Sequence, residues 1–536
     1  MHRHTIAHKF RNGELCNMNT TDKICSVKSP VEFTRAYFGA IMQKSSIVFR
    51  YFDPSADRVF VVGSFNGWTE SLPMQKDRNG VWVADVAKQL CPDGSTYKYK
   101  VCKDETVSYV SDPFCDKTDG EPFKNSVIGY ESGYEWGDQR YLERSLSTCG
   151  GGYDGVPFHV YEMSIEGWCA GFDGDVNCDR AAHELCEYAR QMGYTHVLVT
   201  DAIEGGAPNE TFGACDGLGR FVDVMHKAHV GVIVEWNFDN GQDIYSKQGV
   251  AHEVILHLMH SCHIDGVALT VTDGIGALAA CDVARGIRLG KPDAAIIVRG
   301  QRELIPECDD VIIYDERGGQ ALLDMFTSDF DKRDASLSDL TSGGNGIRGF
   351  GRKRYLGSMP GDDWRAFAGA RAAFSALMLL CGKKHTYMGC ETGMTEGDGQ
   401  MDWSLLDSDC NAGLQLCFSD AGEIYLAHPL LARDDNAVLT DGSYSDSGIA
   451  MIERSGGRES LLILINLGAD AHESKSFAVK SEGVYEEIFN SDSLSYGGSG
   501  VVNQKPLRAR LIDGKEMLTD VRVAPLAVSV FKKRQK

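Results

Sequence analysis

Two groups of residues have types and spacings that could do chemistry. His257, His260 and His263 recur at every third position, which places imidazoles along one side of a helix and would suit zinc. A zinc site needs a further ligand, and a hydrolytic one also needs a glutamate in the His-Glu-x-x-His order, which differs from the order here. We therefore expect hydrogen-bonded core or surface histidines and no metal site.

Three glycines, Gly344, Gly346 and Gly349, match the spacing of a dinucleotide-binding fingerprint. That fingerprint requires a buried strand before it and a helix after it. Here residues 334–341 are polar and residues 350–355 are basic. The pattern therefore predicts a flexible glycine-rich loop, and we expect no dinucleotide or other cofactor.

The net charge restricts the partners of the protein. The chain has 536 residues, of which 43% are hydrophobic, and a formal net charge of −22. This length predicts about three globular domains. Nucleic acids and anionic membranes bind basic surfaces, so neither is an expected partner. A neutral polysaccharide is compatible with this charge.

The cysteines indicate the compartment. There are 17 of them, an odd number without Cys-x-x-Cys spacing. Disulfide frameworks belong to short secreted chains, so we expect reduced thiols and a cytoplasmic location. The first 25 residues lack the apolar run of a secretory signal, and no run of 18 apolar residues predicts a membrane span.

Hydrophobic patterns divide the chain into four parts, whose strands and helices must position any functional site. Residues 1–40 are polar and aperiodic, which predicts a loosely ordered extension. Residues 41–137 contain short β-branched and aromatic segments between turn residues, which predicts a β-sandwich. Its expected strands are 47–52, 58–63, 80–86 and 96–102.

Strands and helices alternate between residues 153 and 435. This alternation is typical of parallel βαβ units, and their number predicts an α/β fold of the (β/α)8 or TIM-barrel class. Strands return in residues 436–536, which predicts a second β-sandwich, joined to the barrel by a polar link at 440–447. The expected barrel strands include 159–163, 195–200, 231–236, 266–271, 294–299 and 310–314, and the expected helices include 183–192, 221–229, 254–262 and 364–381.

Several strings occur in the order found in 1,4-α-glucan branching enzymes. Residues 61–68 (VVGSFNGW), 111–114 (SDPF) and 134–136 (YEW) resemble the starch-binding module that precedes the barrel. Residues 160–162, 167–168, 192–197 (MGYTHV) and 263–266 (HIDG) resemble early barrel strands of that family. Residues 359–364 (MPGDDW), 382–391, 401–407 (MDWSLLD), 490–492 and 496–500 (YGGSG) resemble its later part. From about residue 45 to 532, the chain thus resembles a glycogen or starch branching enzyme of the α-amylase type.

This resemblance implies an activity and its requirements. Branching enzymes cut an α-1,4 glucan and rejoin it as an α-1,6 branch with retention, which needs two carboxyl groups about 5 Å apart. A third carboxylate supports them, and all lie at the carboxyl ends of barrel strands. The implied partners are α-glucan (glycogen or starch) and glucan-synthesising enzymes. Trp68 and Trp82 of the module are the candidate glycan contacts, because aromatic faces stack on sugar rings.

Two of the family's carboxylate positions hold other residues. The nucleophile position is Thr270, and the supporting arginine position is Ala268. The general acid position is Gly300, or Arg299 after a one-residue slip. Threonine is a poor nucleophile without a nearby base, and neither glycine nor arginine donates a proton at neutral pH.

The third carboxylate position and its surroundings differ as well. Counting back from Met359 places that carboxylate at Gly346 and the histidine before it at Asn345. After the third strand, Glu235 preserves a carboxylate, whereas Asn240 replaces a histidine of the family. The family's sugar-stacking Trp-Gly-Tyr-Gln string has no counterpart between residues 201 and 221. The sequence therefore predicts a degenerate member of the family.

Asp273 and Glu303 each lie three residues after a lost carboxylate position. A strand rises about 3.3 Å per residue, so three residues are about 10 Å, too far for a retaining pair. We expect Asp273 to cap a helix and Glu303 to lie in a solvated loop.

These observations predict a catalytically inactive branching-enzyme homologue that binds α-glucan or a partner in glycogen or starch metabolism, as a regulator or scaffold. Two alternatives remain at this point. One is an active 1,4-α-glucan branching enzyme with an unrecognised site. The other is a protein-interaction module that does not bind glycan.

Overall fold

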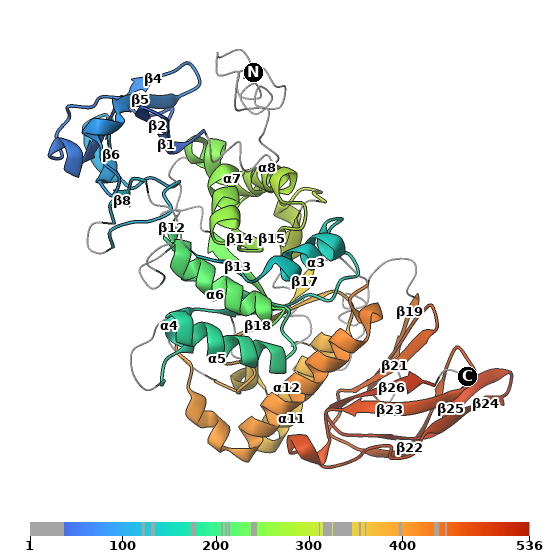
Figure 1. Cartoon of the computed structure of the whole chain (residues 1–536). Helices are drawn as coiled ribbons and strands as arrows, with labels where there is room; N and C mark the ends of the chain where they lie inside the picture. The colour runs from blue at the N-terminus through green and yellow to red at the C-terminus, as the bar shows by residue number, and fades with distance from the viewer. Residues whose placement is uncertain are drawn as a thin grey trace.

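A closed barrel of eight parallel strands forms the centre of the computed structural model (Figure 1). Strands that follow one another in the chain are neighbours in the barrel, and β18 closes it by pairing with β9. In order, these strands are β9 (His159–Met163), β10 (His196–Val199), β13 (Gly231–Trp236), β14 (Gly266–Thr270), β15 (Ala295–Arg299), β16 (Ile312–Tyr314), β17 (Ile347–Arg348) and β18 (Lys383–Tyr387). The expected (β/α)8 fold is confirmed.

The structure describes most of the chain. The described residues are 37–120, 124–129, 134–172, 178–204, 207–208, 212, 215–236, 244–309, 311–314, 324, 346–352, 355–359, 361–395, 399–433, 439–444 and 448–534. Gly344, Asn240, Asn345 and residues 1–36 lie outside them. No helix in this described part of the chain is long and apolar enough to cross a membrane.

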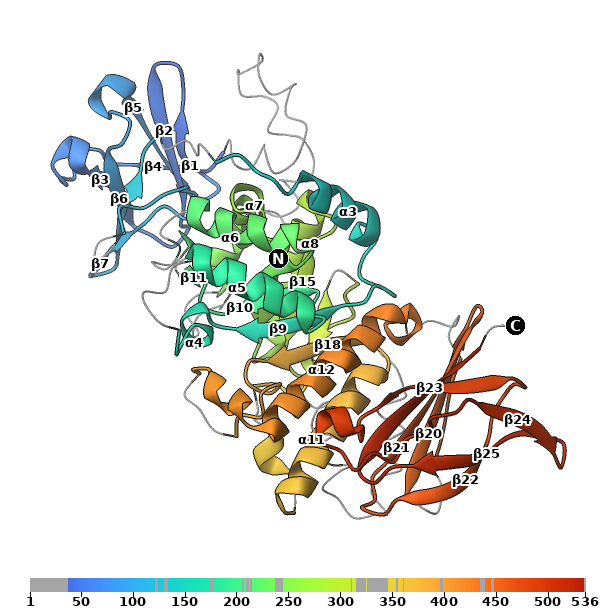
Figure 2. The same ribbon diagram turned by 60° about the horizontal axis from the view of Figure 1, so that its bottom comes forward.

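Helices cover the outside of the barrel (Figure 1), and several of them bury an apolar face. In α5, Ala181, Leu185 and Ala189 recur at helical spacing and are buried. The helix α11 is buried beyond its first turns, because it lies between the barrel and the C-terminal domain (Figure 2). The helices are α3 (Gln139–Cys149), α4 (Ile165–Trp168), α5 (Cys178–Gln191), α6 (Cys215–Lys227), α7 (Ile244–Ser261), α8 (Gly274–Gly290), α11 (Asp363–Leu379) and α12 (Asp409–Ala427).

The N-terminal module consists of two facing sheets, as the strand pattern predicts. On β6, Tyr97, Tyr99 and Val101 point into the core, and the lysines between them point outward. One sheet contains β1 (Gly39–Met42), β2 (Ser46–Phe52), β5 (Val81–Ala87) and β4 (Gln75–Lys76); the other contains β3 (Arg58–Gly63), β6 (Thr96–Lys103), β7 (Thr106–Val110) and β8 (Ser126–Val127). Strand β1 starts two residues before the predicted module boundary.

The module packs against the barrel through α7. The ring of Phe114 lies 5.8 Å from that of His257, and Ser261 donates a hydrogen bond to Asp116 at 3.0 Å. The following linker is held by α6, because Asp223 accepts hydrogen bonds from the Tyr134 hydroxyl and from a backbone amide of the linker.

The C-terminal domain is built from eight antiparallel strands whose two halves enclose a common core. Its strands, in sheet order, are β19 (Leu439–Tyr444), β20 (Ile449–Gly456), β21 (Glu459–Asn466), β26 (Ala527–Lys533), β23 (Val484–Asn490), β24 (Leu507–Ile512), β25 (Lys515–Val523) and β22 (His472–Ala478). The predicted polar link at 440–447 is wrong for residues 440–444, which belong to β19. Among the described strands of this sheet, β19 lies at the edge and pairs with β20.

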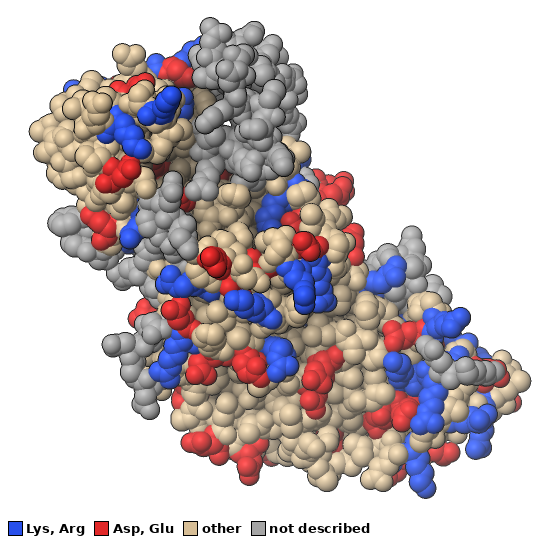
Figure 3. All heavy atoms as spheres, viewed as in Figure 1, with Lys and Arg blue, Asp and Glu red and all other residues tan. Residues whose placement is uncertain are grey.

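Short elements complete the described structure. They are η3 (Ser64–Asn66), η4 (Lys88–Leu90), β11 (Ile203–Glu204), β12 (Ala207–Pro208), η5 (Arg302–Leu304), η7 (Tyr355–Ser358), η8 (Trp403–Asp407), η9 (Pro429–Leu431) and η10 (Leu494–Tyr496). In the view of Figure 3, acidic side chains prevail over the lower helices of the barrel, and Lys and Arg gather on the C-terminal domain.

Candidate functional site

The first two predicted positions both lie on β14. Thr270 is the last residue of β14 and is half-buried. Ala268, two residues earlier, is buried among the apolar side chains that fill the barrel interior. Thr270 thus presents a hydroxyl at the end of β14, and Ala268 contributes a methyl group to the barrel interior.

Gly300 follows the last residue of β15, also at the carboxyl end of the barrel. A Cβ atom at Gly300 would lie 2.7 Å from Val271 Cγ2 and 3.0 Å from the Val271 carbonyl oxygen. These distances are shorter than real Cβ contacts, so a glutamate at this position would require the β14 end to shift.

The predicted position of the third carboxylate is wrong. Gly346 directly precedes β17, so it lies at the amino end of that strand rather than at its carboxyl end. The position was obtained by counting back from Met359 with the spacing of the family, and that count does not reach the carboxyl end of β17. Residues 349–352, which follow β17, contain two glycines, Phe350 and Arg352, and no acidic residue occurs from 346 to 359.

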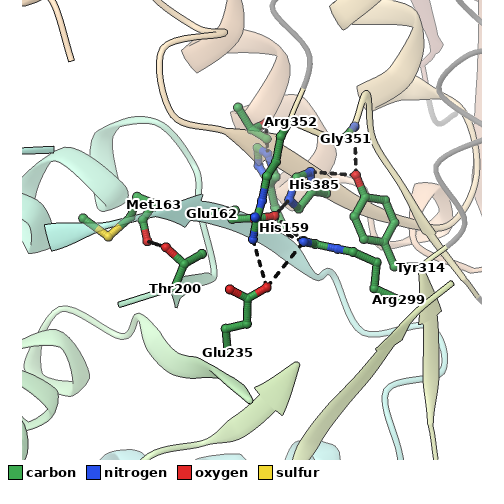
Figure 4. Close-up of polar contacts among 11 residues, drawn as sticks. His159, Glu162, Met163, Thr200, Glu235, Arg299, Tyr314, Gly351, Arg352 and His385 are labelled. Atoms are coloured by element: carbon green, nitrogen blue, oxygen red, sulfur yellow. Dashed lines mark hydrogen bonds and ion pairs between the residues drawn. The ribbon is translucent and has the colours of Figure 1, made fainter. Parts of the chain in front are cut away.

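A buried ionic network lies at the barrel mouth instead (Figure 4). Glu162, next to the end of β9, is fully buried, and its carboxylate accepts hydrogen bonds from Arg299 and Arg352. His385 of β18 lies with Nε2 2.6 Å from Glu162 Oε2. Three donors thus surround one carboxylate.

Glu235 at the end of β13 is the second acidic member of the network. Arg352 Nη2 donates to Glu235 Oε1 at 2.9 Å, and Arg299 Nη1 lies 3.8 Å from the same oxygen. Arg352 therefore bridges the two glutamates from the segment after β17, and Arg299 does so from the end of β15 (Figure 4).

The imidazole of His385 is oriented by Tyr314. The Tyr314 hydroxyl lies 3.1 Å from His385 Nδ1 and accepts a hydrogen bond from the Gly351 amide at 2.9 Å. The two ring nitrogens of His385 therefore lie between the Tyr314 hydroxyl and the Glu162 carboxylate, which fixes the orientation of the ring. The backbone after β17 is thereby tied to β16 and β18.

The network fixes the protonation of its members. Burial opposes ionisation of Glu162, but the hydrogen bond from His385 and the charges of His385, Arg299 and Arg352 outweigh it and lower the pKa of Glu162 far below its usual value. Burial disfavours the charge on Arg299, and Glu162 more than compensates, so the pKa of Arg299 is raised. A general acid needs a raised pKa near the working pH, and Glu162 has the opposite.

The remaining predicted residues have structural partners. Asp273 caps α8, accepting a hydrogen bond from the Gly276 amide at 2.7 Å, as expected. Glu303 is exposed in η5. His263 binds Asp138 at 2.9 Å and stacks on Trp136, whereas His257 faces the N-terminal module.

These histidines do not converge, and in the described part of the chain no three His, Cys, Asp or Glu side chains could hold a metal ion.

The two tryptophans predicted to contact glycan have different surroundings. Trp82 is only 5% exposed, donates its Nε1–H to the Asp53 carbonyl at 2.8 Å, and has Lys76 over its ring. The ring of Trp82 is therefore packed in the core of the module and has no open face for a sugar. The prediction that Trp82 contacts glycan does not fit the structure. Trp68 is 41% exposed at the turn after η3.

Sequence reasoning did not identify most of the network. Glu235 was noted as a retained carboxylate, and Arg299 as a neighbour of the general acid position. Glu162, Arg352, Tyr314 and His385 were missed as site residues. A signal was present, because Glu162 and His385 are polar residues at inward positions of buried strands, where a partner is required. The partner from the loop after β17 could not be read from local patterns.

Comparisons with known proteins agree with this architecture. Residues 37–115 match the family model Carbohydrate-binding module 48 (Isoamylase N-terminal domain), and residues 441–534 match Alpha amylase, C-terminal all-beta domain. A curated 1,4-alpha-glucan branching enzyme GlgB of Cereibacter sphaeroides is 26% identical over 571 residues, covering 86% of this chain and 77% of that protein. A 1,4-alpha-glucan branching enzyme, GlgB 2, of Clostridium perfringens is 24% identical, covering 94% of this chain and 93% of that protein.

Solved structures share the fold. The crystal structure of pullulanase type I from Bacillus subtilis str. 168 complexed with maltose superposes with a TM-score of 0.72 at 12% sequence identity. The superposition covers 93% of this chain and 85% of that one. This likeness concerns the arrangement of the module, the barrel and the C-terminal domain.

Proposed function

We propose that this branching-enzyme-like protein binds α-glucan without transferring glycosyl groups, and acts as a regulator or scaffold in glycogen or starch metabolism. The observation that carries the proposal is the barrel mouth. By the resemblance to branching enzymes, Thr270 and Gly300 correspond to two carboxylates that retaining chemistry needs, and the two glutamates nearby are both ion-paired to arginines.

The rival function is an active branching enzyme that uses Glu162 and Glu235 instead. A retaining enzyme needs one carboxyl group that donates a proton and one carboxylate that attacks the sugar. The lowered pKa of Glu162 argues against a proton donor, and two arginines and a histidine occupy its oxygens. The loss of a complete catalytic set typically costs a factor of about 10⁶ or more in rate.

The exposed face of the N-terminal module supports glucan binding. Trp68 is exposed, and so is Tyr109 of β7, at 53%. The two lie on the same side, because Glu70, two residues after Trp68, pairs with Lys100 at 2.5 Å, and Lys100 lies over the Tyr109 ring. Exposed aromatic rings beside polar side chains suit a sugar chain, whose rings have apolar faces and polar edges.

The test combines binding and activity. The unaltered protein should bind insoluble starch and leave the iodine absorbance of amylose unchanged. Trp68→Ala/Tyr109→Ala should lower starch binding at least tenfold, while Leu90→Ala, an exposed apolar residue of the same module, should not. A fall in iodine absorbance would support the active enzyme. No starch binding by the unaltered protein would support the protein-interaction module.

A further inference from the structure

Two arginines occupy the mouth of the barrel, and we name Arg299 and Arg352 the arginine plug. Behind them, Glu162 and the imidazole of His385 are buried, and the side chain of Glu235 is only 9% exposed. Arg352 is the outermost member, with 46% of its side chain exposed. Among these residues, Arg352 is therefore the one most accessible to a molecule in solvent.

Displacing Arg352 breaks ion pairs with both glutamates. Its Nε donates to Glu162 and its Nη2 to Glu235. Glu162 then retains Arg299 and His385, whereas Glu235, only 9% exposed, retains only Arg299 at 3.8 Å, so its charge is compensated less well and a bound ring must offset that loss. A glucosyl ring is neutral and offers hydroxyl groups, which replace such a charge-assisted interaction poorly.

We propose that Arg299 and Arg352 are specificity-determining residues that close the barrel to α-glucan and confine the glucan to the N-terminal module. This inference rests on the proposed function for the module site, and it adds a second barrier to catalysis. The protein lacks the carboxylates, and the place where a sugar would meet them is filled by its own side chains.

The backbone reinforces the closure. Gly351 donates to the Tyr314 hydroxyl, which holds the segment carrying Arg352 against β16. Arg299 also lies over the Tyr314 ring, with its guanidinium carbon 5.2 Å from the ring centre. Both arginines are therefore anchored to the barrel wall as well as to the glutamates.

The test measures maltotriose binding by isothermal titration calorimetry in a Trp68→Ala/Tyr109→Ala background, which removes the module site. Adding Arg352→Ala should raise the association constant at least tenfold, because a ring then enters beside Glu235 without breaking ion pairs. The matched control is Arg220→Ala. Arg220 of α6 is also 46% exposed and pairs with Asp179 of α5 at 3.3 Å, outside the network of Glu162 and Glu235.

An equal association constant for the Arg352→Ala and Arg220→Ala proteins, both shown folded by chemical denaturation, would overturn the plug. A crystal of the unaltered protein soaked in maltotriose gives an independent answer. Sugar density at the module alone agrees with the plug, and density in contact with Arg352 or Glu235 contradicts it. Failure of the proposed function would be seen in other assays than failure of the plug. In that case Trp68→Ala/Tyr109→Ala would leave starch binding intact, or the unaltered protein would branch amylose.

Discussion

The two ends of the barrel both contain a buried ionic cluster, but the clusters face different surroundings. At the amino end, His226 lies between Asp138 at 2.8 Å and Asp265 at 2.9 Å, and His263 also binds Asp138. At the carboxyl end, Glu162 lies among Arg299, Arg352 and His385 (Figure 4). Each cluster compensates its own buried charges.

The amino-end cluster joins segments that are far apart in the chain. Asp138 precedes α3, His226 lies in the last turn of α6, and Asp265 precedes β14. It is therefore a joint that holds the linker from the N-terminal module to the barrel. The carboxyl-end cluster comes from strand ends that point into the mouth, where barrel enzymes keep their chemistry. Compensation of buried charges thus stabilises the joint to the linker at the amino end, and at the carboxyl end it holds the arginine plug in the barrel mouth.

The largest expected effect is at the carboxyl end. Glu162→Ala leaves Arg299, Arg352 and His385 facing one another with only Glu235 to compensate, so the free energy of unfolding should fall by about 3–5 kcal/mol. Chemical denaturation measures this. Glu187→Ala, which removes an exposed partner of Arg190, is the control and should cause no measurable change. Equal stability of the two variants would mean that the network does not hold the mouth.

The amino-end cluster should be distinguishable by its pH dependence. Burial opposes the charge of His226, and the carboxylates of Asp265 and Asp138 outweigh burial, which raises the pKa of His226 to about 9. A raised pKa contributes stability that is full below the unfolded value of about 6.5 and is lost as the pH rises through about 9.

His226→Gln should therefore lower the free energy of unfolding by about 2–4 kcal/mol at pH 6, and the difference should shrink above pH 9. Denaturation curves at pH 6, 8 and 10 measure it. The Glu162→Ala difference should persist at pH 10, because the pKa of Glu162 is lowered and both arginines stay charged. A His226→Gln difference independent of pH would contradict a protonated His226.

A smaller loss of stability is expected when a carboxylate is introduced at position 300. Gly300→Glu places a Cβ against Val271 and should destabilise the protein by about 1–3 kcal/mol, without creating branching activity. Gly274→Glu is the matched control, because a Cβ there meets no atom within 4 Å and the residue starts α8. Thermal unfolding compares the two. Gly300→Glu as stable as the control would show that the end of β14 yields easily.

The barrel and both flanking β-domains could be predicted from the sequence because they rest on local patterns. The alternation of Tyr97, Tyr99 and Val101 and the buried strands β9 and β13 need no distant partner to be recognised. Thr270 and Gly300 could be expected near the ends of β14 and β15, because the strings that resemble the family lie close to them, and the structure places Thr270 at the end of β14 and Gly300 directly after β15. Gly346 was misplaced, since its position depended on a count across a segment of unknown length.

The ionic network was beyond sequence reasoning for a physical reason. Arg352 meets Glu162 across 190 positions of the chain, and only barrel closure brings them together. The burial of Trp82 could not be predicted from the sequence either. An aromatic residue on a strand gives the same local pattern whether its ring is exposed or, as here, covered by Lys76.

The most direct test of the account is whether the unaltered protein forms α-1,6 linkages. Amylose is incubated with stoichiometric protein, and the α-1,6 anomeric protons are quantified by NMR beside a heat-denatured sample and an active branching enzyme. The account expects no linkages above the denatured control at any time. Branch points that accumulate with time and protein concentration would contradict it, and would mean that the barrel mouth opens and contains a working carboxylate pair.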